Sequence, residues 1–579
     1  MKNCLLISVF IFWLMAGKSQ DCPVDIYVFD TQSKVDNFAN NYPNCTITDH
    51  PIWIWGGSIT NLNGLKQLTS IGGDLLIIGC KSLTDISGLS NIQNVYGSLE
   101  IKGNEQMEDL DGLNALKSLD YLTISENDQL LDISGFNGIE EESSIFIYDN
   151  PSLSSISGFN DLIEIFSDII LSRNPMLNSL EGFSTLRTVE GNIRIEDCGF
   201  LEVADHFQKL DSLYGNLVYI NNHRLKQFSG FDSLEFVGQL IKISDNDSLG
   251  MMGGFKRMDA VQCNIEIHNN PILSQFNSFE NTKLCTGNLE FIGNDAMEIF
   301  DALNKLQTVR GNLQFSSNDN LLRIDGLNKL DTVIQILYIL NNDTIQQLFS
   351  HDKLKYCGGL NIGWNPFINM LTGFNSLDTL HGNLVISGNN SLSNLNGLES
   401  LKYIKGFINI SFNKLLNNIE GIQNIDPLSI QAFEDGQYDL NITVNKELSE
   451  CAIENICQFI NLPNIYYLIF GNKVGCNSSE EINETCQPQA NSFAPGGDKF
   501  AVYPNPASVF TRLPYSLDFD LPYSLSFIDQ LGNIAKIFKI RNDADQNKLI
   551  YVGDLTPGLY LIQISNGQNN KTGKLIIAP

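Results

Sequence analysis

The sequence is poor in positive charge. Its 579 residues contain 36 Lys and Arg against 66 Asp and Glu, which gives a formal net charge of -30. Nucleic acids and anionic membrane surfaces attract proteins with basic patches and repel a chain of this charge. We therefore exclude these two partner classes, and the balance suits a soluble exported protein.

Motifs of common enzymes and metal sites are also missing. The 6 His include no H-E-x-x-H pair, and the chain has neither a G-x-S-x-G elbow nor a G-x-x-x-x-G-K-[ST] loop. Asp245-Asn246-Asp247 lacks the Gly and the distant Glu of an EF-hand loop, and no C-x-x-C pair points to zinc. We expect no catalytic residue, no metal and no cofactor.

Long apolar runs are confined to the N-terminus. Lys2 precedes an apolar stretch over Cys4–Ala16, and the small residues Gly17 and Ser19 follow it. This pattern is typical of a secretory signal peptide, with cleavage expected before Gln20. The run is too short for a spanning helix, so we expect no transmembrane segment in the mature chain.

The chain is organised around a column of asparagines spaced 23 or 24 residues apart. A period of 20–50 residues indicates a solenoid, a propeller or an array. The column consists of Cys80, Asn104, Asn127, Asn150, Asn174, Cys198, Asn222, Asn246, Asn270, Asn294, Asn318, Asn342, Asn365, Asn389 and Asn413.

Each repeat carries the pattern of one short strand. Apolar residues stand five and three places before the Asn, as Leu99 and Ile101 do before Asn104. One intervening outward residue gives strand alternation, so stacked coils form a parallel sheet with strands about 4.8 Å apart and a length on the order of 70 Å. Residues four and two places before each Asn then face outward.

Inside the coils, an apolar residue follows a Gly that stands eight places after the Asn in most repeats. In seven consecutive repeats this residue is Phe: Phe136, Phe159, Phe183, Phe207, Phe231, Phe255 and Phe279. We expect one internal row, interrupted at His351. We expect the Asn amides to pair buried backbone groups at the turn after each strand, with Cys80 and Cys198 as small buried substitutes.

The strand pattern resembles leucine-rich repeats, which read L-x-L-x-x-N. It departs from them because the preceding apolar residue stands nine places before the Asn, as Val95 and Val189 do, and a pair such as Gly191-Asn192 intervenes. This register resembles the receptor L-domain over about residues 51–446. The predicted fold is mainly β, a right-handed solenoid of this type with about 16 coils and disulfide caps.

The last segment has no 24-residue period. Val502–Ala507 (VYPNPA), Asp529 followed by Gly532, Leu555–Leu561 and Lys574–Ile577 together resemble the C-terminal sorting domain of type IX secretion in the Bacteroidetes. The resemblance implies that residues 499–579 engage the type IX machinery and that the cargo is released or attached at the outer cell surface.

Short β runs in this segment predict a small antiparallel sandwich. They are Tyr523–Ile528, Lys536–Ile540, Lys548–Val552, Leu559–Ile564 and Lys574–Ile577. The predicted organisation is a signal peptide at 1–19, an N-terminal cap at 20–50, the solenoid at 51–446, a Cys-rich C-terminal cap at 447–486, a linker at 487–498 and the sorting domain at 499–579.

Export permits disulfides. Cys22 and Cys45 are expected to close the N-terminal cap. In the C-terminal cap, Cys451–Phe459 is predicted to be a short helix, and the four cysteines of that cap pair in one of three ways: Cys451, Cys457, Cys476 and Cys486. The other cysteines are predicted to be buried thiols, although Cys263 and Cys285 in adjacent repeats can also bond: Cys80, Cys198, Cys263, Cys285 and Cys357.

Two function classes fit such a solenoid. The first is a binding or adhesion protein that recognises a protein or glycan ligand on its long surface. The alternative is an exported β-solenoid enzyme that degrades polysaccharide, which needs acids and bases clustered on adjacent coils. Arg194 and Glu196 share one strand, and Glu266 and His268 share another, two repeats or more away. We therefore predict no such cluster and no enzyme activity.

Several outward positions are apolar where a plain solvent face would be polar. Exposed aromatic patches mark interaction sites, so these residues are the predicted ligand contacts. The alternative is that loops cover them or that they pack across strands. The predicted contacts are Phe146, Tyr148, Ile170, Tyr338, Leu340 and Trp364.

Overall fold

The computed structural model describes residues 22–430, 438–463 and 465–486, and in the C-terminal part residues 502, 507, 510–511, 523–529, 533–540, 550–565 and 570–577. The chain divides into two compact units, Met1–Gln487 and Pro488–Pro579. The predicted signal peptide at 1–19 and the predicted linker at 487–498 lie outside the described residues.

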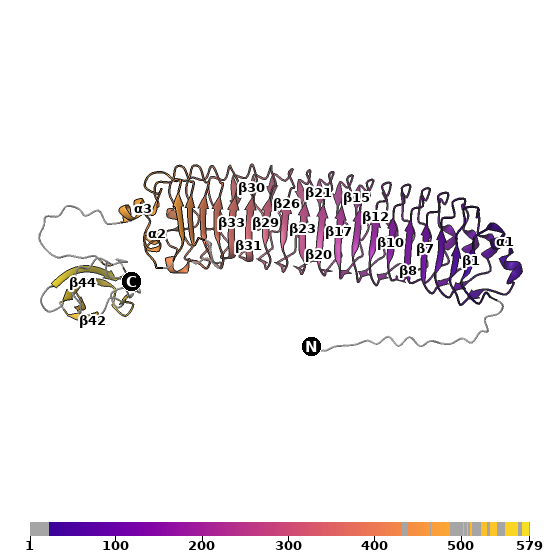
Figure 1. The fold of residues 1–579 in the computed structure, drawn as a ribbon, viewed down its shortest axis with the longest axis horizontal. Coiled ribbons are helices and arrows are strands. Elements are labelled where there is room, and N and C mark those ends of the chain that lie inside the picture. The colour runs from indigo at the N-terminus through magenta and orange to yellow at the C-terminus, as the bar shows by residue number, and fades with distance from the viewer. Residues whose placement is uncertain are drawn as a thin grey trace. The chain divides into compact units, whose positions relative to one another are not determined.

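The first unit is a β-solenoid built on one 24-stranded parallel sheet, whose strands lie side by side along the unit (Figure 1). Its principal ladder takes one strand from each coil. These strands are β1 (Tyr27–Phe29), β3 (Ile52–Ile54), β5 (Leu75–Ile78), β7 (Ser98–Lys102), β8 (Tyr121–Ser125), β10 (Ile145–Tyr148), β12 (Ile169–Ser172), β14 (Ile193–Glu196), β17 (Asn216–Ile220), β20 (Leu240–Ser244), β23 (Asn264–His268), β26 (Leu289–Ile292), β29 (Leu313–Ser316), β31 (Thr332–Leu340), β33 (Tyr356–Gly363), β35 (Leu384–Ser387), β37 (Ile408–Ser411), β38 (Leu440–Thr443) and β39 (Tyr467–Phe470).

The predicted alternation is confirmed in this ladder. Leu99 and Ile101 are fully buried, whereas the intervening Glu100 is half-buried. The ladder also extends beyond the predicted coils. β1 pairs with β3 inside the expected N-terminal cap, and β38 and β39 continue the sheet after β37. The sheet is therefore longer than predicted, roughly 85 Å at about 4.8 Å per strand.

Shorter strands form ladders on the other sides of the coils. The residues nine places before the Asn column lie in β4 (Ser70–Ile71), β6 (Asn94–Val95), β9 (Glu141–Glu142), β11 (Glu164–Ile165), β13 (Thr188–Val189), β16 (Ser212–Leu213), β19 (Phe236–Val237), β22 (Ala260–Val261), β25 (Leu284–Cys285), β28 (Thr308–Val309), β34 (Thr379–Leu380) and β36 (Tyr403–Ile404), and β2 (Ile47–Thr48) pairs with β4. A further side carries β15 (Val203–Ala204), β18 (Gln227–Phe228), β21 (Met251–Met252) and β24 (Gln275–Phe276), then β27 (Ile299–Phe300), β30 (Arg323–Ile324) and β32 (Gln347–Phe349).

The predicted phenylalanine row runs through the core. Neighbouring rings from Phe136 to Phe279 stack with centroids 4.5–5.7 Å apart and interplanar angles of 5–19°. His351 interrupts the row, as predicted, and its side chain is exposed. Phe349 replaces it in the core, where it packs edge-on against Phe374 at 5.7 Å.

The asparagine column binds each coil to the next. In the repeat of Asn222, Oδ1 accepts from the backbone N–H of Cys198 at 3.0 Å, and Nδ2 donates to the carbonyl of Ile195 at 3.0 Å. The column continues past Asn413 to Asn445 and Asn472. Cys80 and Cys198 are fully buried in the same column, as predicted.

The residue before each column Asn turns the chain inward. It takes a left-handed backbone in nearly every coil, as Asp149 (φ 57°) and Gly103 (φ 66°) do. On the other side of the strand, the Gly-Asn pair makes a corner. Asn192 Oδ1 accepts from the backbone N–H of Asn216 at 2.9 Å, and a Cβ on Gly191 would lie 2.3 Å from the Ser167 carbonyl.

Both ends of the solenoid carry helices and disulfides. The helices are α1 (Gln32–Asn41), α2 (Glu454–Phe459) and α3 (Ser479–Cys486). Cys22 bonds Cys45, as predicted. Among the three possible pairings of the C-terminal cysteines, the structure has Cys451–Cys476 and Cys457–Cys486, the second of which joins α2 to α3.

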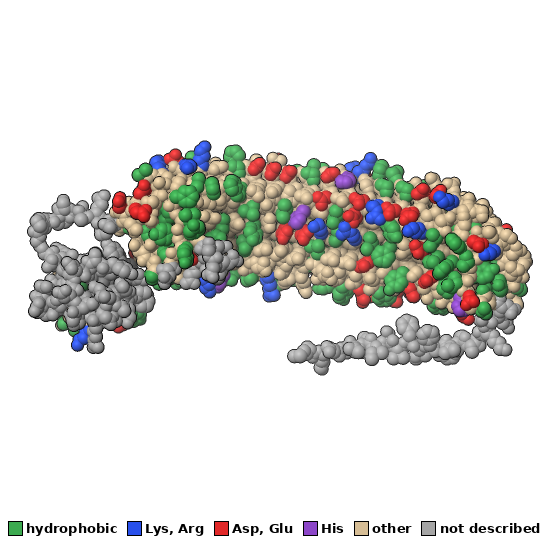
Figure 2. All heavy atoms as spheres, in the orientation of Figure 1, with side chains coloured by type: hydrophobic (Ala, Val, Ile, Leu, Met, Phe, Trp, Pro, Cys, Tyr) green, Lys and Arg blue, Asp and Glu red, His purple; other side chains and the backbone are tan. Residues whose placement is uncertain are grey.

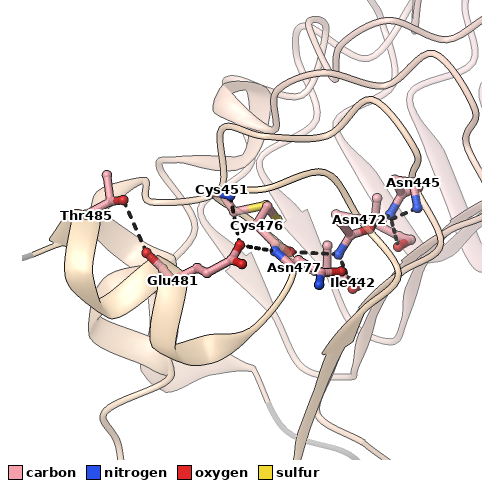
Figure 3. Close-up of a disulfide and its surroundings, with 10 residues drawn as sticks. Ile442, Asn445, Cys451, Asn472, Cys476, Asn477, Glu481 and Thr485 are labelled. Atoms are coloured by element: carbon pink, nitrogen blue, oxygen red, sulfur yellow. Dashed lines mark hydrogen bonds between the residues drawn. A yellow bond between two sulfur atoms is a disulfide. The ribbon is translucent and has the colours of Figure 1, made fainter.

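The Cys451–Cys476 bond lies where the asparagine column ends (Figure 3). Asn472 Nδ2 donates to the carbonyls of Ile442 at 2.8 Å and Cys476 at 3.0 Å, so the disulfide fixes the last member of the column.

Cys263 and Cys285 are not bonded to each other. Both are buried free thiols, so the alternative of a disulfide between these repeats was wrong. In the sheet register Cys285 lies opposite Val261, two residues away from Cys263. Burial raises the pKa of each of these two thiols to about 12.

The second unit contains a four-stranded antiparallel sheet in the order β42-β41-β44-β45. Its strands are β41 (Tyr523–Ile528), β42 (Ile534–Ile540), β44 (Gly558–Ser565) and β45 (Asn570–Ile577), close to the predicted runs. A second pair, β40 (Phe510–Thr511) with β43 (Ile550–Tyr551), is also antiparallel. Strand β40 has no counterpart among the predicted runs, whereas β43 lies within the predicted run Lys548–Val552.

Candidate ligand-binding face

The principal ladder presents two rows of outward side chains, four and two places before each Asn. The parallel register sets equivalent residues directly opposite one another, so Phe146 faces Ile170 and Tyr148 faces Ser172. Figure 2 shows charged side chains across the middle of the solenoid and hydrophobic ones gathered over both its N-terminal and its C-terminal coils. The face therefore has chemically different segments.

Three of the predicted contacts meet on β10 and β12. Phe146, Tyr148 and Ile170 are all half-buried, and the first and last are cross-strand neighbours. The guanidinium of Arg173 lies 5.8 Å from the centroid of the Tyr148 ring and pairs with Asp149 at 2.6 Å. This group is a small aromatic and aliphatic patch with a cation at its rim.

The other three predicted contacts lie on β31 and just after β33. Tyr338 and Leu340 are half-buried, and Leu340 faces Gly363, which precedes Trp364. Trp364 keeps 56% of its surface exposed. Partial burial raises the pKa of Tyr338, so the phenol stays protonated and neutral.

The structure does not unite the two groups. Eight strand steps separate β10 from β31 along the ladder, which corresponds to roughly 38 Å. One small ligand cannot touch both groups, whereas an extended ligand or two separate ligands can.

A contact that the outward rows do not include lies beside Trp364. The rings of Trp364 and Phe412 stack with centroids 6.2 Å apart and an interplanar angle of 28°. Gly388 lies in the coil between them, and a Cβ there would stand 2.7 Å from Trp364 Cδ2, so the indole rests on its backbone. Phe412 is 48% exposed.

Both rings stand one place before the Asn column, a position for which strand alternation predicts no direction. The left-handed backbone at Trp364 (φ 57°) and Phe412 (φ 58°) turns their side chains out of the coil. The sequence could have pointed to these two residues, because most other coils have Gly, Asn, Asp or another polar residue at this position. Further exposed hydrophobic residues in these coils are Phe367, Met370, Leu415 and Phe470.

The middle of the face carries an ionic network. Lys242 Nζ lies 2.8 Å from Glu266 Oε2, and His268 Nε2 lies 3.3 Å from Glu290 Oε2. Glu266 and Glu290 are directly opposite on β23 and β26. The prediction that outward positions form no cluster of acids and bases was therefore wrong, because residues 24 places apart in sequence become neighbours in the ladder.

The chemistry of this network is that of paired ions. Hydrogen bonding from His268 lowers the pKa of Glu290, so its carboxylate stays ionised and is a poor proton donor near neutral pH. Arg194 and Glu196 form another pair, at 2.6 Å from Nε to Oε2. Among the residues that the structure describes, no group of three or more His, Cys, Asp or Glu is arranged to hold a metal ion.

Within the described ranges, no helix combines the length and the apolar character that crossing a bilayer requires.

Comparisons with known proteins match two parts of the chain. Residues 501–578 match the secretion system C-terminal sorting domain, and residues 378–487 match the receptor L domain. Among solved structures, a leucine-rich repeat protein from Bacteroides ovatus is 14% identical, with 52% of this chain and 82% of that chain covered and a TM-score of 0.18. No curated protein matches the sequence.

The two family matches fall in different parts of the chain. The last coils of the solenoid, with the C-terminal cap, match a receptor L domain, and the C-terminal unit matches a secretion sorting domain. The sorting domain indicates secretion or attachment at the cell surface through the type IX pathway.

Proposed function

We propose that the protein is a binding or adhesion module that recognises a protein or glycan ligand through the outward face of its principal ladder. The observation that carries this proposal is the hydrophobic surface left open on the face of an exported solenoid. Trp364, Phe412 and Phe470 are each about half exposed or more, at 56%, 48% and 50%. Exposed apolar patches of this kind mark interaction sites.

The alternative explanation by cross-strand packing fits one of the two groups better than the other. Phe146 and Ile170 shield each other in the ladder and are half-buried, as strand packing requires. Trp364 instead extends beyond its own strand and lies on a Gly backbone. Packing alone does not need an aromatic ring there, which supports a ligand-binding role for the C-terminal coils.

An exported polysaccharide-degrading enzyme is the second candidate, because Glu266 and Glu290 place two carboxylates side by side. Glycoside hydrolysis needs one carboxyl group with a raised pKa as the acid. The pKa of Glu290 is lowered, and Lys242 neutralises Glu266. These pairings favour a structural network, and we propose that the protein is not an enzyme.

A protein and glycan array probed with residues 20–490 tests the proposal, since this stretch covers the first compact unit except for the predicted signal peptide. We expect binding to a defined set of ligands and no loss of ligand chain length on prolonged incubation. Release of reducing ends from any bound polysaccharide, abolished by Glu266→Gln, would instead support the enzyme.

Export through a cleaved signal peptide is part of the same proposal. Residues 1–19 have the required pattern of a charged start, an apolar run and small residues. Sequencing the N-terminus of the exported protein should yield Gln20 as its first residue, and an intact Met1 would refute the assignment.

A further inference from the structure

The six C-terminal strands of the principal ladder have no charged outward residue. Across β31, β33, β35, β37, β38 and β39 the two rows consist only of uncharged side chains and one Gly. They are Tyr338, Leu340, Asn361, Gly363, Val385, Ser387, Asn409, Ser411, Asn441, Thr443, Leu468 and Phe470. We call this set the neutral segment.

Charged outward residues lie instead on four strands between β14 and β26, whereas β17 and the adjoining β29 are uncharged. The charged residues are Arg194, Glu196, Lys242, Glu266, His268 and Glu290, each beside an oppositely charged partner or, for His268, a carboxylate. The chain carries a net charge of -30. A neutral ligand is not repelled by this charge and can approach the uncharged stretch over six strands. An anionic ligand would meet repulsion from the whole chain and no basic partner in the neutral segment.

Aromatic rings form a platform along one edge of this segment. Trp364 and Phe412 stack at 6.2 Å across Gly388 and leave about half of each ring in solvent. A non-glycine residue with a left-handed backbone costs free energy, and Asn or Asp tolerate it better than Trp or Phe. The fold therefore does not explain these two aromatic residues, whereas stacking against a ligand does.

Polar groups beside the platform have unused hydrogen-bonding capacity. Among the described residues, Oδ1 of Asn409 and Oδ1 of Asn441 are buried acceptors without a hydrogen-bond partner. Ser387 and Ser411 form a pair of hydroxyl groups 3.0 Å apart on the neighbouring strands. Buried polar groups are normally satisfied, so these two amide oxygens are acceptors that hydroxyl groups of a ligand would pair.

We propose that the neutral segment, with Trp364 and Phe412 at its edge, binds an uncharged polysaccharide. Such a polymer offers apolar C–H faces for the aromatic rings and hydroxyl groups for the amides and serines. Its repeating units suit a surface on which amide and hydroxyl side chains recur from strand to strand. This inference rests on the proposed function, because it names the ligand class for the same face.

The test uses the full chain in affinity electrophoresis and calorimetry with soluble neutral polysaccharides: a mixed-linkage β-glucan, a galactomannan and soluble starch. Polygalacturonate is the anionic probe. The inference predicts binding to at least one neutral polymer and none to polygalacturonate. Trp364→Ala combined with Phe412→Ala should weaken the neutral interaction by about tenfold or more.

A matched control is Trp55→Ala, which removes an indole of similar exposure, 59%, from the opposite end of the solenoid. It should bind like the parent. Asn409→Asp introduces a charge without changing side-chain size and should also weaken binding. Unchanged melting temperatures in all variants establish that the fold is retained.

Failure of the inference differs from failure of the proposed function. If no neutral polymer binds, or if the Trp364 and Phe412 variant binds neutral polymers as the parent does, the inference is wrong. A protein ligand found on the array and lost on the same double substitution would overturn the polysaccharide while the binding role of the face stands. Array ligands that bind the double variant and every other face variant equally well would overturn both.

Discussion

The backbone N–H of Asn222 donates to Oδ1 of Asn246 in the next coil at 3.0 Å. Asn222 itself provides the same acceptor to the backbone N–H of Cys198 in the preceding coil, also at 3.0 Å. Asn222 thus accepts a hydrogen bond from one neighbouring coil and gives one to the other, as Asn150 also does. The column therefore has a structural role, which substitution of Asn222 tests.

Asn222→Ala should lower the free energy of unfolding by roughly 1–3 kcal/mol, because it leaves the Cys198 N–H and the Ile195 carbonyl buried and unpaired. Chemical denaturation of the first unit measures the loss. Asn222→Cys, the residue found at Cys80 and Cys198, is the matched variant and should lose less. A parent-like melting curve with abolished ligand binding would show instead that the column serves recognition.

Burial of Glu142 should make the stability of the folded chain depend on pH. Glu142 is 2% exposed in a row otherwise occupied by residues such as Ile165, and burial raises the pKa of its carboxyl group from 4.5 to about 8. Between these two values the folded chain holds a proton that the unfolded chain has lost. The contribution of Glu142 to stability therefore falls as the pH rises from about 4.5 to about 8 and changes little above that.

Glu142→Gln should remove this slope. At pH 8 we expect the variant to be more stable than the parent by about 2–4 kcal/mol, with nearly equal stabilities at pH 5. The exposed neighbour Glu141→Gln is the control and should leave the pH profile unchanged. Denaturation curves for parent and Glu142→Gln that stay parallel from pH 5 to pH 8 would show that the carboxyl group is not buried as described.

Removal of the sorting domain should change the location of the protein without unfolding the first unit. Deleting Lys499–Pro579 leaves the first compact unit intact, because that unit ends at Gln487. The truncated protein should accumulate in the periplasm with parent-like resistance to protease. Normal display or secretion of the truncated chain, measured by surface labelling and fractionation, would contradict the role of residues 501–578.

Much of the fold follows from local sequence, because one period repeats the same strand and turn. The Asn column, the alternation around Leu99 and Ile101 and the row from Phe136 to Phe279 were predictable on this basis. The two last coils were not, because the spacing of the column lengthens. It is 32 residues from Asn413 to Asn445 and 27 from Asn445 to Asn472.

The candidate site was only partly predictable. Trp364 stood out as an aromatic residue near the outward rows, but Phe412 lies two coils away and meets it only because Gly388 has no side chain. The network of Lys242, Glu266 and Glu290 was missed because each partner belongs to a different repeat. Contacts of this kind depend on the register between coils.

The most direct test of the account is ligand binding by a full chain carrying Tyr148→Ser and Tyr338→Ser, one change in each predicted group on the sheet face. The control carries Tyr96→Ser and Tyr403→Ser, two tyrosines that are 62% and 51% exposed outside the outward rows. We expect the first variant to lose affinity for its array ligand and the control to retain it, with both melting like the parent. Parent-like binding by the first variant, with an unchanged melting curve, would contradict recognition through the sheet face.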